Sequence, residues 1–168
     1  MANDLIDHYA MGAEVLNYAA QGLSLEQERS RPGPGTWSLA ELVAHVLDAD
    51  LVISDRIKRV IAEDRPTLLA FDENAWIERL DSNAMPMVET AALFAANRRW
   101  MVRLLRNRPE PDFGRIGVHS SAGPLTLAEL VAKATGHLDH HLRFLYAKRA
   151  SLGVSLYPRY ASNDAAKD

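Results

Sequence analysis

Ser38-Leu-Ala-Glu-Leu-Val-Ala-His45 is the stretch from which the fold can be argued, and six of its residues recur in Thr126-Leu-Ala-Glu-Leu-Val-Ala-Lys133. A Ser or Thr followed three residues later by Glu is a capping box, in which each side chain binds the other residue's backbone N–H at the start of a helix. Both stretches therefore predict the first turn of an amphipathic helix. The repeat has two interpretations: a favourable helix start that is used twice, or a pseudo-symmetric pairing of the two helices.

Apolar residues recur at helical spacing in four long segments. These segments extend from about residue 5 to 21, from 38 to about 63, from 86 to about 107 and from 126 to about 149. A short helix is expected at 71–80, and Gly and Pro residues predict loops at 31–36 and 108–125. Four long amphipathic helices and few β-branched runs predict an all-α protein, a four-helix bundle.

Composition narrows the class of protein. The chain has 168 residues, which predicts a single domain over 1–150 with a C-terminal tail at 151–168 that frays after Tyr160. A formal charge of −3 argues against a nucleic-acid partner, and no apolar run is long enough for a membrane span. With no cysteine, disulfides, thiolate metal sites and Cys nucleophiles are excluded. The polar, acidic N-terminus is unlike a signal peptide, so we expect a cytoplasmic protein.

Three of the six histidines fall on or near predicted buried helix faces. His137 and His141 are four residues apart, so both point inward from one helix, and His45 lies at the edge of the buried face of another. Two imidazoles at this spacing can share one metal ion. Histidines that are satisfied within the core, or a metal-free catalytic histidine, are the alternatives. His140 lies off the buried face.

Other metal frameworks do not match the sequence. It contains no His-Glu-x-x-His, and no Glu stands three residues before a histidine, which excludes the zincin and di-iron bundle patterns. A three-histidine site with open positions remains, and open positions favour catalysis. We expect one divalent ion per chain, Zn, Ni or Fe, because imidazole suits all three.

Residues 5–148 resemble the DinB/YfiT-like superfamily of metalloenzymes. The resemblance rests on Thr36-Trp37-Ser38 followed by Glu41 and His45, on Phe71-Asp-Glu-Asn-Ala-Trp76, and on Gly123-Pro-Leu-Thr126 leading to Gly136-His-Leu-Asp-His-His141. It implies an up-down-down-up four-helix bundle, often dimeric, with one ion held by His45, His137 and His141. It also makes Trp76 a candidate wall of the substrate site. Many members carry an acidic residue at the position of Leu138; here Asp139 follows instead, on the predicted outer face.

Characterised relatives include thiol-dependent transferases, and because this chain has no cysteine, any sulfur nucleophile would come with a low-molecular-weight thiol cosubstrate. The hypothesis is therefore a metal-dependent enzyme acting on a small molecule, a thiol-dependent transferase or a hydrolase. The alternatives are a metal-binding protein without turnover and a helical interaction protein. The apolar residues of the 86–107 helix spread over more than one stripe, and this surplus predicts a homodimer; they are Leu93, Phe94, Trp100, Met101 and Leu104.

Overall fold

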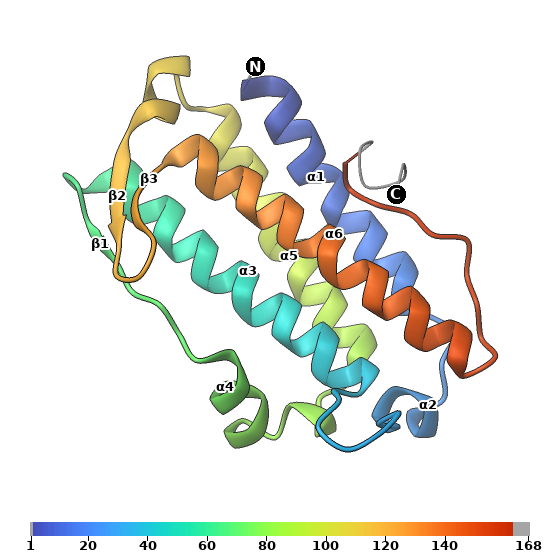
Figure 1. The fold of residues 1–168 in the computed structure, drawn as a ribbon. Helices are drawn as coiled ribbons and strands as arrows, with labels where there is room; N and C mark the ends of the chain where they lie inside the picture. Colours follow the sequence, from blue (N-terminus) through green and yellow to red (C-terminus); the bar gives the residue numbers. More distant parts are fainter. Residues whose placement is uncertain (1, 163–168) are drawn as a thin grey trace.

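Six α-helices form most of the structure, a computed structural model that describes residues 2–162 (Figure 1). They are α1 (Ala2–Ala19), α2 (Leu25–Arg29), α3 (Leu39–Ala62), α4 (Glu73–Arg79), α5 (Met87–Arg106) and α6 (Leu127–Ser151). Two short 3₁₀ helices lie in the connections, η1 (Ser82–Ala84) and η2 (Glu110–Gly114). The four long helices and α4 are those that the sequence predicts, whereas the five-residue α2 is not predicted.

The long helices form a four-helix bundle in which α1 and α3 each pack against both α5 and α6 (Figure 1). α1 and α6 run in one direction, and α3 and α5 run in the other. Because α3 and α5 are consecutive long helices that point the same way, the chain must return along the bundle between them, through residues 63–86. This is the predicted up-down-down-up order, and it sets α3 antiparallel to α6.

Both predicted capping boxes are present. Ser38 Oγ accepts a hydrogen bond from the Glu41 backbone N–H at 3.1 Å, and the Glu41 carboxylate accepts one from the Ser38 N–H at 2.8 Å. Thr126 and Glu129 make the same exchange at the start of α6. These bonds satisfy backbone donors that a helix start leaves free, so the first turns of α3 and α6 are fixed by local sequence.

A buried guanidinium joins the four long helices at the centre of the bundle. Arg98 of α5 donates to the Asp50 carboxylate of α3 at 2.7 Å, to the Tyr9 carbonyl of α1 at 3.2 Å and to the Ala134 carbonyl of α6 at 2.8 Å. Gly12 makes room for it, because a Cβ atom at this position would lie 2.7 Å from Arg98 Nη1. The contacts therefore fix the relative positions of all four helices.

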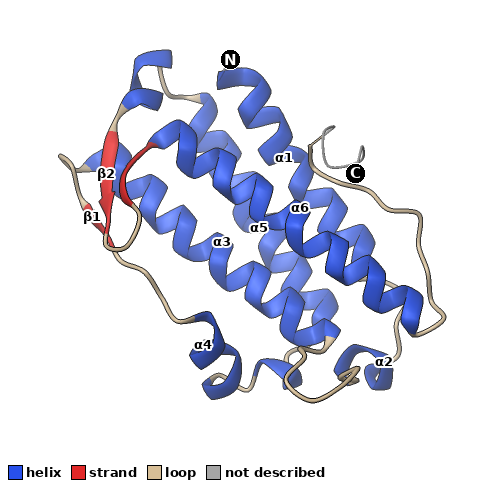
Figure 2. Ribbon diagram, viewed as in Figure 1, coloured by secondary structure: helices blue, strands red, loops and turns tan. Residues whose placement is uncertain are grey.

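A small three-stranded sheet, which the sequence pattern does not predict, closes the far end of α3 (Figure 2). Its strands are β1 (Thr67–Leu68), β2 (Ile116–His119) and β3 (Gly123–Thr126), in the order β1-β2-β3. β1 is parallel to β2, and β2 is antiparallel to β3. The loop prediction for 108–125 is wrong over η2, β2 and most of β3, because strands of four residues or fewer show no alternating pattern. Pro124 is compatible with β3 because that strand is at an edge.

The chain after α6 returns along the bundle and is held by Asp139. The Asp139 carboxylate accepts hydrogen bonds from the backbone N–H groups of Ala161, at 2.7 Å, and Ser162, at 3.0 Å. Ala161 is fully buried. Two predictions are therefore wrong: the tail is not frayed directly after Tyr160, and Asp139 is buried because the returning chain covers its face of α6. The rest of the predicted fraying, at 163–168, lies outside the described residues.

Within residues 2–162, no helix is both long and apolar enough to cross a membrane.

Candidate metal centre

His45 enters the bundle from the second turn of α3, seven residues after the Ser38 cap. Its side chain is the most enclosed of the three predicted ligands, and the residue is only 2% exposed. The indole of Trp37, directly before the cap, packs on the imidazole with ring centroids 4.9 Å apart. The helix start therefore fixes both the position of His45 and the wall that limits rotation of its ring.

His137 and His141 face His45 from successive turns of α6. The Nε2 atoms of the three rings lie 3.1 Å apart in each of the three pairs. An early position on α3 thus meets late positions on α6, because the two helices pack side by side in opposite directions. The centre also lies beside Trp37, at the end of the bundle that holds the 31–36 loop.

The spacing of these nitrogens fits a single transition ion. Three donors that each lie about 2.0–2.1 Å from one ion, at angles between 90° and 110°, are separated from each other by about 2.8–3.4 Å. The observed 3.1 Å falls in this range. Without an ion, the Nε2 lone pairs of three neutral rings would face each other, or the three Nε2 atoms would share a single proton. The donor set is therefore arranged as ligands.

Burial keeps these imidazoles neutral. It lowers the pKa of His137 to about 4 and that of His141 to about 3, and the neighbouring histidines add to the effect. The pKa of His45 is also lowered by burial, although the nearby Glu73 carboxylate opposes the shift. A histidine must be deprotonated to bind a metal, so at neutral pH all three have the form that a ligand needs.

Two other residues named from the sequence lie outside this cluster of three histidines. His140 is exposed, as predicted, and its ring packs edge-on against His141 with centroids 5.0 Å apart. Trp76 of α4 packs on Phe71 with centroids 4.8 Å apart, and both line a hollow of about 600 Å³ against α3. A substrate-binding role for Trp76 stays a prediction.

Glu73 is a residue of the centre that the sequence reasoning missed. Its carboxylate lies 3.7 Å from His45 Nε2, and its side chain is 53% exposed. The residue stands within the Phe71–Trp76 stretch, which drew attention to Trp76 alone. Spacing along the chain could not place Glu73 near His45, because the crossover between α3 and α5 determines where α4 lies.

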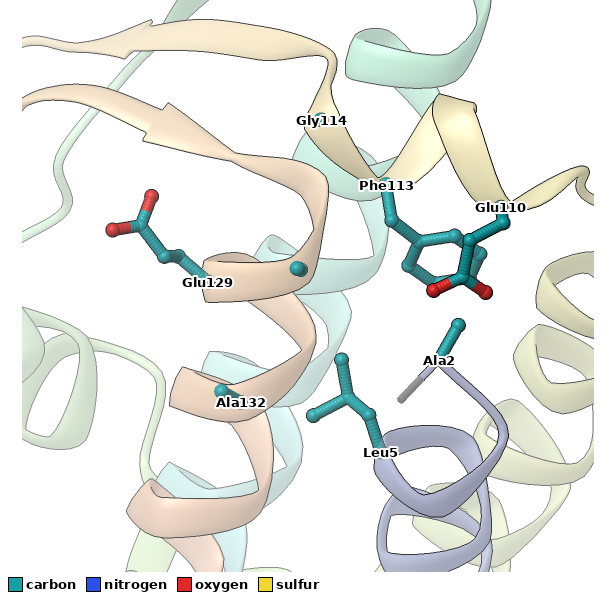
Figure 3. Close-up of a pocket in the computed structure, with 8 residues that line it drawn as sticks. Ala2, Leu5, Glu110, Phe113, Gly114, Glu129 and Ala132 are labelled. Atoms are coloured by element: carbon teal, nitrogen blue, oxygen red, sulfur yellow. The ribbon is translucent and has the colours of Figure 1, made fainter.

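A second hollow, of about 500 Å³, lies around the start of α6 (Figure 3). Leu5 of α1 and Phe113 of η2 form apolar walls, and Glu110 and Glu129 stand at its sides. No histidine lines it, whereas His137 and His141 lie further along α6. The hollow is therefore separate from the metal centre.

Comparison with known proteins finds relatives that are named for a metal-dependent activity. A "Putative metal-dependent hydrolase" of Geobacillus thermodenitrificans is 30% identical over 142 residues, which are 83% of this chain and 79% of that protein. A similarly named protein of Geobacillus kaustophilus is 32% identical over 128 residues, 75% of this chain and 71% of that protein.

A solved structure shares the arrangement of the helices. YfiT from Bacillus subtilis, described as "a probable metal-dependent hydrolase with an unusual four-helix bundle topology", has a TM-score of 0.84 and 22% identity, and the match covers 92% of this chain and 89% of YfiT. This similarity establishes the fold. The sequence model of the DinB superfamily matches residues 8–145, which is most of the chain. The chain belongs to the DinB superfamily.

Proposed function

We propose that this protein is a metal-dependent hydrolase that acts on a small molecule and holds one divalent ion, Zn, Ni or Fe, through His45, His137 and His141. The observation that carries the proposal is the convergence of three Nε2 atoms at 3.1 Å from one another. The names of the two relatives from Geobacillus support the same class of reaction.

The residues around the centre hold its ligands in place. Trp37 packs against one face of His45, and His140 packs against His141 and is itself in edge contact with Phe144, at 5.0 Å between ring centroids. Rings that cannot rotate keep their nitrogens aimed at one point, which lowers the entropy lost on binding an ion. A bound divalent ion would lower the pKa of a coordinated water molecule or polarise a substrate carbonyl.

Removal and restoration of the ion tests this function. Chelator-treated protein is assayed against a panel of small esters, amides and phosphate esters, before and after Zn²⁺, Ni²⁺ or Fe²⁺ is restored. We expect turnover that depends on the restored ion and is lost in His45→Ala. His119→Ala is the matched control, because His119 belongs to β2 and bonds to Ser121 and Ala122 rather than to the cluster.

The same panel separates hydrolysis from its nearest alternative. Because the chain has no cysteine, a thiol-dependent transfer would require an added low-molecular-weight thiol. Turnover in water alone supports the hydrolase, and turnover only with the thiol supports a transferase. Turnover that is equal with and without the ion, and equal in His45→Ala, would contradict metal-dependent catalysis.

A further inference from the structure

We propose that Glu73 is a fourth protein donor of the metal centre, with its carboxylate oxygen on the solvent side of the three imidazoles. The inference rests on the proposed metal centre and adds a ligand to it. It also gives a role to α4, the short helix in the crossover between α3 and α5, which the bundle itself does not require.

Glu73 lies close to one of the three histidines, and its carboxylate would move further in to share an ion with all of them. Its Oε2 atom lies 3.7 Å from His45 Nε2, a few tenths of an ångström beyond the separation of about 2.8–3.4 Å expected for two donors of one ion. Within the described residues, the donor atoms that all lie within 4.8 Å of one another are those of the three histidines alone, so the carboxylate is further from His137 or His141. The side chain is 53% exposed, so its torsions are free to bring the carboxylate toward the three nitrogens. His45, by contrast, is enclosed and held by Trp37, so any adjustment falls to the carboxylate.

Local contacts place α4 so that Glu73 faces the centre. The Asp72 side chain caps the helix by accepting a hydrogen bond from the Ala75 N–H at 3.0 Å, and Ile77 is buried beneath it. The following 3₁₀ helix is tied to the start of α3, because Ser38 Oγ donates to Asn83 Oδ1 at 2.7 Å. The residue that caps α3 thus also anchors the unit that carries Glu73.

The chemistry of the two donor types is complementary. Three neutral imidazoles leave the full charge of a divalent ion uncompensated, and a carboxylate neutralises half of it. Asp and Glu oxygens bind zinc at about 2.0–2.2 Å alongside histidine nitrogens, so the mixed set suits such an ion. Loss of the carboxylate should therefore weaken binding without abolishing it, because the three histidines remain.

The test measures metal binding rather than activity. Zn²⁺ affinity is determined by competition with a chelator, and the visible absorption spectrum of the Co²⁺-substituted protein reports the ligand set. Glu73→Gln removes the charge at nearly constant shape. Asp72→Asn is the matched control: it removes one negative charge from the same end of α4 and keeps a capping side chain. Glu73→Asp restores the charge on a shorter side chain.

We expect Glu73→Gln to weaken Zn²⁺ binding by about 10–100-fold, the range seen when a supporting group of a metal site is lost, and to change the Co²⁺ spectrum. Asp72→Asn should stay within about twofold of the wild type, and Glu73→Asp should recover part of the loss. If the wild type binds Zn²⁺ and Glu73→Gln matches it in affinity and spectrum, the Glu73 assignment is overturned. If the wild type binds no more tightly than His141→Ala, the failure belongs to the three-histidine centre instead.

Discussion

At the scale of single residues, the protonation of His137 and His141 links the centre to the stability of the fold. Burial holds the pKa of His137 at about 4 and that of His141 at about 3 in the folded chain, whereas a histidine in an unfolded chain has a pKa of about 6.5. The unfolded chain therefore binds more protons than the folded chain between these values. The free energy of unfolding is therefore undiminished by these two groups above about pH 6.5. It decreases as the pH falls toward 4 for His137 and toward 3 for His141.

The corresponding prediction concerns metal-free protein. Its free energy of unfolding, measured with urea at several pH values, should fall between pH 6.5 and 4, by at most about 1.4 kcal/mol per pH unit for each histidine. A His137→Gln/His141→Gln variant should have a shallower slope in that range, because neither position can then take up a proton on unfolding. Equal slopes in the two proteins would show that these histidines do not titrate as the structure implies.

At the scale of elements, local sequence signals are enough to predict the helices. The strands and the position of α4 depend on contacts between residues far apart in the chain, so they could not be predicted. The capping boxes at Ser38 and Thr126, with the apolar periodicity behind them, are enough to predict α3 and α6, and an antiparallel pair brings His45 to His137 and His141. β1 could not be predicted, because two residues acquire a strand conformation only by pairing with β2, far along the chain. Glu73 was missed for the same reason: its place depends on how the crossover folds back.

The C-terminal segment gives a prediction at this scale. Asp139→Ala removes the acceptor of the Ala161 and Ser162 N–H groups, so we expect a loss of about 1–3 kcal/mol in unfolding free energy and faster amide hydrogen exchange in this segment. Ser162→Ala, which removes only the hydroxyl bond to Asp139, should have a smaller effect. Unchanged exchange at Ala161 in Asp139→Ala would mean that other contacts hold the segment.

At the scale of the whole molecule, the Arg98–Asp50 ion pair joins the four long helices. Arg98→Met leaves the Asp50 carboxylate buried without its guanidinium, so we expect a loss of about 3–5 kcal/mol in chemical denaturation. The double variant Arg98→Met/Asp50→Leu buries no charge at this place and should be less destabilised than Arg98→Met alone. If the double variant loses as much unfolding free energy as Arg98→Met and Asp50→Leu lose together when measured singly, the two residues are not a coupled pair.

The homodimer stays a prediction at this scale. Of the apolar residues of α5, Phe94 and Met101 are fully buried, whereas Leu93 is 54% exposed and Trp100 is 62% exposed. An outer helix face of this kind is where we expect a second chain to pack. Light scattering at micromolar concentration should give twice the chain mass, and Trp100→Glu should lower it. A wild-type mass of 18.6 kDa would show a monomer.

The metal content of the purified protein tests the central claim most directly. Elemental analysis of the wild type should find about one divalent transition ion per chain. His141→Ala should lose this ion, because one of the three converging nitrogens is removed, and His140→Ala, which changes the neighbouring exposed ring, should retain it. Equal metal content in the wild type and His141→Ala, or no ion in the wild type after incubation with Zn²⁺, Ni²⁺ or Fe²⁺, would contradict a metal centre at His45, His137 and His141.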